Sequence, residues 1–125
     1  MRSSDEAQDP ATLLPLPAAA MYILTALGTG PLHGYGLMTE IRELSGGTVE
    51  LGPGTLYGSV KRMLGQGLIA ESDERPDPSL DDQRRRYYEL TAFGARVAVA
   101  EQARLAELAA AAAARLPRWV PGTTG

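Results

Sequence analysis

The sequence predicts a mainly α-helical fold with a small β-hairpin, arranged as a winged helix-turn-helix followed by a long C-terminal dimerisation helix. Apolar residues recur at helical spacing in three segments between residues 17 and 66. Two short runs of strand-forming residues, 68–72 and 84–90, flank a long polar turn. An alanine-rich helical pattern then continues over residues 91–116. Three helices, a hairpin and a terminal helix in this order indicate that architecture.

The first two helices are predicted from their apolar spacing and from the residues at their ends. Residues 1–15 are polar with scattered prolines, so we expect a disordered N-terminal segment. The first helix is predicted over residues 17–27, with proline at a favourable first position and Gly28 as its stop. A short turn leads to the second helix, predicted over residues 35–44. Its apolar stripe comprises Leu37, Met38, Ile41 and Leu44.

The third helix is predicted to start after Gly52, a tolerable N-cap, with Pro53 in its first turn, and to end before Gly67. The preceding residues 48–51 alternate in polarity and predict either a short strand or an extended segment. The residues expected on the buried face recur at i, i+4, i+7 and i+8 and are Leu56, Val60, Met63 and Leu64.

The remaining elements are a hairpin and an alanine-rich helix. The strands at 68–72 and 84–90 are joined by a polar turn, and Thr91 is the predicted cap of the last helix, which Pro117 ends. Nothing else in the chain can cover the apolar stripe of this helix, so we expect a homodimer. The predicted dimer interface consists of Leu105, Leu108, Ala112 and Leu116.

The chain length allows one compact domain with one appended helix. We expect the winged helix-turn-helix domain over residues 16–90 and the dimerisation helix over residues 91–116. Residues 117–125 are expected to form a flexible tail.

Composition excludes several classes of protein. The 125 residues include no cysteine and one histidine, which removes disulfides, thiol nucleophiles and metal sites built from cysteines or several histidines. No segment approaches the roughly 20 apolar residues of a membrane span, and no signal sequence is evident, so we expect a soluble cytoplasmic protein. No nucleophile–base set is evident either, so we expect neither an enzyme nor a cofactor.

Positive charge is concentrated in two places, although the net charge is −3. Between residues 51 and 68 the only charged side chains are Lys61 and Arg62, and residues 84–86 are three consecutive arginines. The acidic residues gather elsewhere. This distribution predicts a cationic surface for double-stranded DNA on an otherwise acidic protein.

Burial of the apolar face of the third helix leaves five side chains outside that can donate to phosphates or base edges. They are Thr55, Tyr57, Ser59, Lys61 and Arg62. We interpret this flank as a DNA-contacting surface, with an ordinary solvated face as the alternative. Tyr57 has the further alternative of packing against the second helix. The sequence does not decide which side chains read bases and which bind phosphates.

The second strand of the hairpin starts with Arg84, Arg85 and Arg86, which alternate across it, so Arg85 points opposite to its neighbours. Either Arg84 and Arg86 contact phosphate while Arg85 turns toward the acidic turn, or the reverse holds. The alternative is that all three serve solubility and pair with Asp81 and Asp82.

Three other side chains each have more than one interpretation. His33 is expected to form a hydrogen bond at the start of the second helix, with a phosphate contact as the alternative. Tyr35 either contacts a phosphate or packs in the core. Trp119 lies beyond the terminal helix and packs on it, is disordered, or stacks on a ligand.

Four motifs occur in order along the chain. They are Gly30-Pro31-Leu32-His33-Gly34-Tyr35, Leu51-Gly52-Pro53-Gly54-Thr55-Leu56-Tyr57, Gly67-Leu68-Ile69 and Arg85-Arg86-Tyr87-Tyr88-Glu89-Leu90-Thr91. Over about residues 21–94 they closely resemble the PadR family of bacterial transcriptional regulators, and the single terminal helix resembles its shorter subfamily. The resemblance implies a homodimer that binds an inverted repeat near a promoter, usually as a repressor. In some members of that family, a small aromatic or drug-like effector releases the DNA.

Two glycines depart from the commonest family pattern. Gly52 stands where serine often caps the helix, and Gly58 stands where a larger, often basic, residue is frequent. Gly58 weakens the helix by about 1 kcal/mol relative to alanine and supplies no side chain for a base contact. Together with the acidic balance and the single lysine, it supports an alternative function, a winged-helix module for protein interaction or small-molecule sensing without strong DNA binding.

Overall fold

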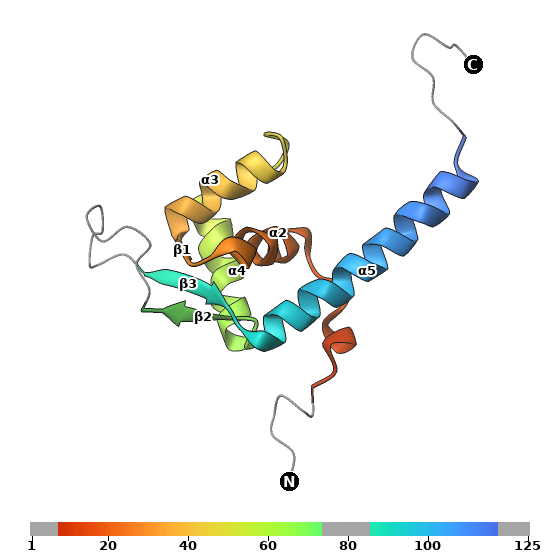
Figure 1. The fold of residues 1–125 in the computed structure, drawn as a ribbon. Helices are drawn as coiled ribbons and strands as arrows, with labels where there is room; N and C mark the ends of the chain where they lie inside the picture. The colour runs from red at the N-terminus through yellow and green to blue at the C-terminus, as the bar shows by residue number, and fades with distance from the viewer. Residues whose placement is uncertain (1–7, 74–85, 118–125) are drawn as a thin grey trace.

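The computed structural model describes residues 8–73 and 86–117 (Figure 1). The described α-helices are α2 (Ala18–Ala26), α3 (Gly34–Leu44), α4 (Pro53–Gly65) and α5 (Ala92–Arg115). The other described elements are the 3-10 helices η1 (Pro10–Leu13) and η2 (Leu27–Thr29) and the strands β1 (Leu32–His33), β2 (Ile69–Ser72) and β3 (Tyr87–Leu90). The predicted fold class, mainly helical with a small β-sheet, is confirmed.

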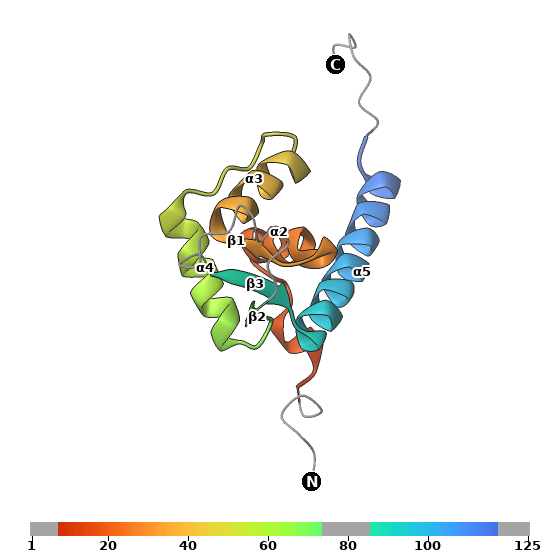
Figure 2. The ribbon, with the colours of Figure 1, turned by 60° about the vertical axis from the view of Figure 1, so that its left-hand side comes forward.

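Helix α2 lies at the centre of the molecule and contacts α3, α4 and α5. Figure 2 shows α3 and α4 on one side of α2 and α5 on the other. Because α3 and α4 both rest on α2, their relative orientation is set by a common support. This arrangement positions α4 at the surface with one side buried and the other outward.

The sheet has three antiparallel strands in the order β1-β3-β2. Strand β3 pairs with β2 through Ile69↔Leu90 and with β1 through Leu32↔Tyr88. The sequence predicted only a turn where β1 lies, because a strand of two residues is too short to show an alternating pattern. Residues 48–51 do not form the strand that was one of the two predicted alternatives: Thr48 is a bend, and residues 49–51 have no regular secondary structure.

The core is built from one face of each helix and the start of the sheet. Its fully buried side chains include Ile23, Leu24, Leu37, Ile41, Leu56, Met63, Leu68 and Val97. Two predicted core residues are instead exposed, Leu44 at the end of α3 and Leu64 on α4. Leu44 is in line with Leu37 and Ile41 but is the last residue of α3, whereas Leu64 lies at the edge of the apolar stripe of α4.

Two of the predicted helix boundaries are confirmed by specific hydrogen bonds or angles. The hydroxyl of Thr91 accepts from the Gly94 amide at 2.9 Å and donates to the carbonyl oxygens of Gly67 and Leu68 at 2.6 and 3.0 Å. Gly67 follows α4 with φ of +76°, the left-handed conformation that favours glycine. Thr91 therefore joins the end of the α4–β2 turn to the start of α5.

The segment before α2 differs from the prediction of a disordered N-terminus over residues 1–15. Residues 10–13 form η1, which contacts α5, and Leu13 and Leu14 pack against the core. The Leu16 amide donates to the Glu101 carboxylate of α5 at 3.0 Å. The sequence could not predict this order because the anchor is a side chain 85 residues further along the chain. Residues 1–7 lie outside the described residues.

Helix α5 runs from the edge of the sheet, past α2, and extends beyond the winged domain (Figure 1). At its start, a Cβ on Gly94 would lie 1.9 Å from the Leu68 carbonyl oxygen, so only glycine allows this close approach. The described strand β3 starts at Tyr87 and not at Arg84 as predicted, and Arg84 and Arg85 lie outside the described residues.

Candidate nucleic-acid interface

The outward side of α4 carries four of the five side chains that the sequence predicted for it. Thr55, Tyr57, Lys61 and Arg62 are exposed. Pro53 occupies the first turn and Gly52 is the N-cap, without a side-chain hydrogen bond to the helix. The first amides of α4 are therefore not covered by a capping side chain.

The prediction that Ser59 is exposed is wrong. Ser59 is only 3% exposed, and its hydroxyl oxygen accepts a 3.4 Å hydrogen bond from the Arg62 guanidinium. Ser59 lies three residues after Leu56 and four before Met63, so it belongs to the buried stripe of α4. The Arg62 side chain bends back to satisfy this hydroxyl, and Ser59 cannot reach a nucleic acid.

Tyr57 packs on the start of α3, which was the alternative interpretation of this residue, although 47% of it remains exposed. A Cβ on Gly34 would lie 2.1 Å from the Tyr57 hydroxyl oxygen, so the phenol ring covers the Gly34 backbone. Burial, followed by the proximity of Tyr57 and Glu71, raises the pKa of Tyr88. Tyr57 therefore links α4 to α3 and lies near the sheet.

The start of α3 combines a structural histidine with an exposed tyrosine. His33 is the N-cap, and its Nδ1 accepts from the Gly36 amide at 3.0 Å. The predicted hydrogen bond at the helix start is thus observed, and it places the proton of neutral imidazole on Nε2. Tyr35 is 68% exposed, so its alternative of core packing does not hold.

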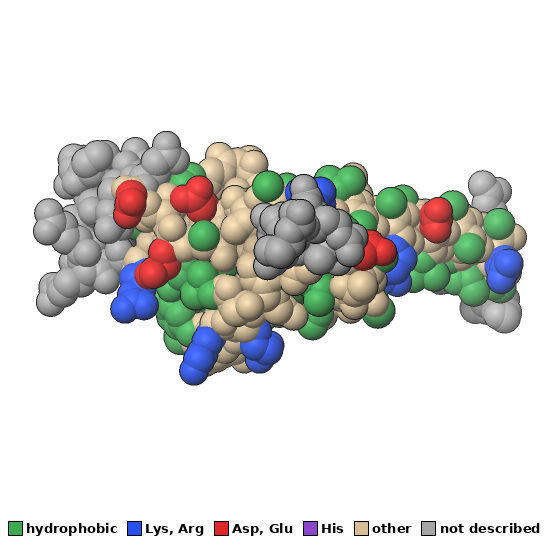
Figure 3. Space-filling view, turned by 90° about the horizontal axis from the view of Figure 1, so that it is seen from below, with side chains coloured by type: hydrophobic (Ala, Val, Ile, Leu, Met, Phe, Trp, Pro, Cys, Tyr) green, Lys and Arg blue, Asp and Glu red, His purple; other side chains and the backbone are tan. Residues whose placement is uncertain are grey.

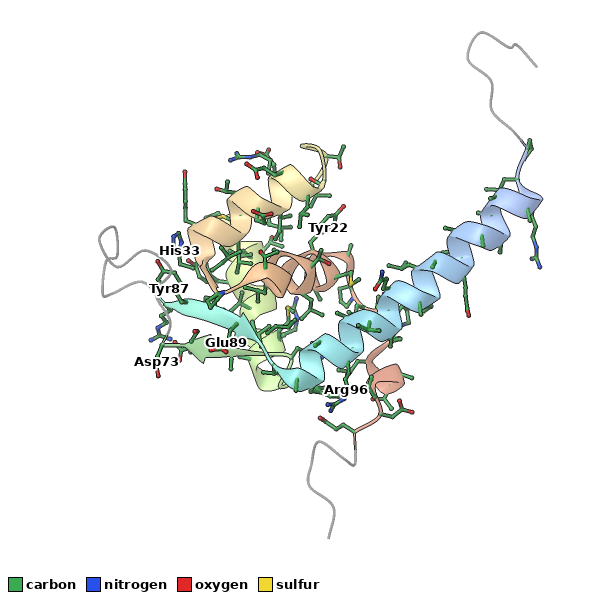
Figure 4. The ribbon with its side chains drawn as sticks, viewed as in Figure 1. Tyr22, His33, Asp73, Tyr87, Glu89 and Arg96 are labelled. Carbon is green, nitrogen blue, oxygen red and sulfur yellow. The ribbon has the colours of Figure 1, made fainter. Side chains whose placement is uncertain are left out.

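The base of the wing, the β2–β3 hairpin, carries charges of both signs. Arg86 lies 3.5 Å from Glu71, with both side chains largely exposed. Figure 4 shows His33 and Tyr87 side by side where the wing leaves the sheet, with Asp73 at the end of β2. The rings of His33 and Tyr87 meet edge to face at 5.2 Å between centroids. Arg86 therefore pairs with an acidic side chain, but this is Glu71 and not Asp81 or Asp82, the predicted partners, which lie outside the described residues.

On the face shown in Figure 3, basic side chains are most frequent along the lower edge of the winged domain, and some acidic side chains lie next to basic ones, as Glu71 does to Arg86. Other Asp and Glu side chains lie above this edge, beside the wing. This distribution agrees with the sequence, in which residues 51–68 carry Lys61 and Arg62 and no acidic residue.

A cavity of about 390 Å³ lies between α2 and α5. Side chains that line it include Ala18, Met21, Tyr22, Leu44, Arg104 and Leu105. Glu101, only 2% exposed, also lines it and accepts hydrogen bonds from the Arg104 guanidinium, with Nη2 at 3.0 Å, and from the Leu16 amide. These hydrogen bonds, Arg104 foremost, lower the pKa of Glu101, and the same pair raises the pKa of Arg104.

Sequence reasoning missed this ion pair between the buried Glu101 and the partly exposed Arg104. The available signal was Glu101 itself, which lies four residues after Val97 and four before Leu105, within the apolar side of α5. A carboxylate in that position requires a partner, and Arg104 is one turn away.

The predicted dimer residues on α5 lie at the surface of the single chain. Leu105, Leu108 and Leu116 are exposed, and Ala112 is half-buried. They follow the side of α5 that also carries the buried Val97 and Glu101. Trp119 lies outside the described residues.

The part of the chain that the structure describes contains neither a metal site nor a membrane-spanning helix. Within residues 8–73 and 86–117, no group of three or more His, Cys, Asp or Glu side chains is arranged to hold a metal ion. Over the same residues, every helix is too short or too polar to cross a bilayer.

Comparison with known families decides the class of this protein. The model of the family described as "Transcriptional regulator PadR-like family" matches residues 23–100. The chain belongs to this family. The family is one of transcriptional regulators, as the motifs predicted.

Solved structures of PadR proteins share the fold. A PadR family transcription regulator from Clostridium difficile has a TM-score of 0.67 at 22% identity, over 81% of this chain and 100% of that chain. Bacillus subtilis PadR, solved in complex with operator DNA, has a TM-score of 0.54 at 20% identity, over 89% of this chain and 54% of that chain.

A curated relative comes from Streptomyces fradiae. It is an uncharacterized 37.1 kDa protein in transposon TN4556, 42% identical over 57 residues. The match covers 46% of this PadR-like chain and 16% of that protein, so the chain spans a small part of its length.

Proposed function

We propose that this PadR-like chain is a homodimeric, sequence-specific DNA-binding repressor that acts in the cytoplasm on an inverted-repeat operator. The observation that carries the proposal is the outward side of α4, where Thr55, Lys61 and Arg62 are exposed and no acidic residue intervenes. An α-helix fits the major groove of B-form DNA, and lysine and arginine are suited to guanine edges and phosphates. The operator complex of B. subtilis PadR is a precedent for DNA binding by this fold.

The wing supplies the second contact. Arg84 and Arg85 lie outside the described residues, and we assign one or both to phosphate contacts beside α4, with Arg86 held by Glu71 at the base of the wing. Tyr35, exposed at the start of α3, is a further phosphate donor in this proposal. Phosphate contacts of this kind fix the position of a protein on the duplex without reading sequence.

Dimerisation through α5 would pair two copies of α4. Leu108 and Leu116 are exposed further along α5 than Leu105, which lines the cavity beside α2, and in this proposal a second copy covers them without contacting α4. A two-fold dimer places two recognition helices on half-sites about one helical turn apart, which is the reason for the inverted repeat. Repression follows if the operator overlaps a promoter, because the bound dimer blocks polymerase.

The cavity between α2 and α5 is our candidate site for a small aromatic or drug-like effector. Its volume of about 390 Å³ lies in the range of small-molecule sites, roughly 300–1,000 Å³. The cavity lies where the winged domain meets the dimer helix α5. A ligand that changes the angle between the winged domain and α5 would therefore change the distance between the two α4 helices of the dimer. Release of DNA is the expected result.

Selection from a random-sequence duplex library is the direct test. The protein is expected to enrich an inverted repeat, to bind it with steep salt dependence, and to lower transcription from a promoter that overlaps it. Failure to enrich any sequence, with no binding to duplex DNA at low salt, would contradict the proposal. The alternative function, a protein-interaction or ligand-sensing module, would then be favoured if small aromatic compounds still raised the melting temperature.

A further inference from the structure

Gly58 lies near the middle of the side of α4 that faces away from the core. The buried residues of α4 are Leu56, Ser59, Val60 and Met63. Successive side chains are rotated by about 100° around the helix axis. The direction opposite to the mean direction of these four side chains therefore points close to Gly54, with Lys61 on one side of it and Gly58 on the other. The most outward part of the recognition helix therefore carries almost no side chain except Lys61.

Nothing in the described residues requires glycine at position 58. Its φ is not in the left-handed region, and no described atom lies within 4 Å of where a Cβ would be. This contrasts with Gly34 and Gly94, where a Cβ would meet Tyr57 or the Leu68 carbonyl. Alanine would fit at position 58 and would favour the helix, so stability alone does not explain the glycine.

The surroundings of Gly58 are hydrogen-bond donors. On a helix, its neighbours at i−3, i+3 and i+4 are Thr55, Lys61 and Arg62. All three are exposed, and Gly58 is half-buried. In angle around α4, Gly58 lies between Lys61 on one side and Thr55 and Arg62 on the other, so the backbone at position 58 is flanked by side chains that can bind bases or phosphates.

We propose that Gly58 lets the α4 backbone approach DNA closely and that it sets the depth of α4 in the major groove. This inference rests on the proposed function and adds to it. A helix without a side chain at position 58, near the middle of its outward side, can lie deeper in the groove, because glycine permits close backbone approach. Thr55, Lys61 and Arg62 then reach the base edges and phosphates from either side.

The proposal predicts that stability and DNA binding change in opposite directions at one position. In Gly58→Ala, the melting temperature should rise by roughly 3–6 °C, because alanine is the better helix former. Affinity for the operator selected by the wild-type protein should fall at least tenfold. Gly58→Leu should weaken binding further, since a longer side chain holds the helix further from the groove floor.

Two comparisons distinguish a change in the depth of α4 in the groove from a general loss of DNA affinity and from a general effect of replacing glycine by alanine. Affinity for a scrambled duplex at low salt should change less than twofold, because the protein charge is unaltered and non-specific binding is electrostatic. Gly28→Ala is the matched control: a Cβ at Gly28 is as unobstructed as one at Gly58, and Gly28 is exposed and lies in η2, outside the proposed DNA contacts. This variant should bind the operator like the wild type.

Fluorescence anisotropy with the selected operator decides the outcome. A more stable Gly58→Ala protein that binds at least tenfold more weakly supports the proposal. Equal or tighter binding by Gly58→Ala, while the wild type binds specifically, would overturn the role of Gly58 and leave the proposed function standing. If the wild type bound no duplex DNA, both would be overturned.

Discussion

At the scale of single residues, the packing of Tyr57 on Gly34 explains how α4 is held against α3. A methyl group at position 34 would overlap the Tyr57 hydroxyl and Cζ, at 2.1 and 2.6 Å. Because Tyr57 is half exposed, its ring can turn aside, so Gly34→Ala is expected to cost about 1 kcal/mol, the low end for overpacking. Urea denaturation measures this loss of stability.

A second background isolates the cause of that loss. In Tyr57→Ala protein the hydroxyl is gone, so adding Gly34→Ala should cost less than about 0.5 kcal/mol. Equal losses of stability in the two backgrounds would show that Gly34 is required for some reason other than Tyr57.

The exposure of single side chains on α4 could be predicted from the sequence at some positions and not at others. Lys61 and Arg62 could be placed on the outside because no apolar residue lies on their side of α4. Ser59 could not be placed correctly, because a polar side chain was assumed to be exposed although its spacing from Leu56 and Met63 puts it in the buried stripe. Spacing was the better guide than polarity at this position.

At the scale of elements, Glu101 connects α5 to the segment before α2. Hydrogen bonds from Arg104 lower the pKa of Glu101 in the folded state. A carboxylate of this kind stabilises the fold above its unfolded pKa of about 4.3. The stabilisation is lost as the pH falls through the lowered folded value.

Glu101→Gln tests this linkage, because glutamine keeps the shape of the side chain and removes its charge. At pH 7 the wild type should resist urea better than the variant. The difference should shrink as the pH falls below about 4.3, the ordinary pKa of glutamate, and through the lowered pKa of Glu101, since the wild-type carboxylate becomes protonated there. A difference that persisted unchanged at the acid end would show that charge is not what Glu101 contributes.

The helices could be predicted from sequence because each has an apolar stripe and recognisable ends, as with Thr91 and Gly67. Strand β1 and helix η1 could not. They are short, and partners distant in sequence hold them, β3 for the former and α5 for the latter. Short elements that depend on tertiary packing carry no periodic signal of their own.

At the scale of the whole molecule, the exposed apolar side of α5 predicts that the protein has the mass of a dimer in solution. Leu108 is 58% exposed in the single chain, so Leu108→Asp should leave the protomer folded while placing a charge in the proposed dimer interface. Light scattering should give a monomer mass for this variant and a dimer mass for the wild type.

Val99 provides the matched control for that experiment. It is 64% exposed and lies nine residues before Leu108, about half a turn around α5 and so on the opposite side. Val99→Asp should remain dimeric. A dimer that survived Leu108→Asp, or one that dissociated in Val99→Asp, would place the interface elsewhere.

The most direct test of the central claim, that the outward side of α4 binds operator DNA, is one salt-dependent anisotropy titration of the wild type and a Lys61→Ala/Arg62→Ala variant. We expect the variant to bind the selected operator at least tenfold more weakly, with a salt slope lower by about 0.9 for each phosphate that it no longer neutralises. Its free energy of unfolding should fall by no more than about 1.5 kcal/mol, because both side chains are exposed and the only described hydrogen bond lost is the one from Arg62 to the Ser59 hydroxyl. Unchanged affinity and salt slope in a folded variant would contradict the claim.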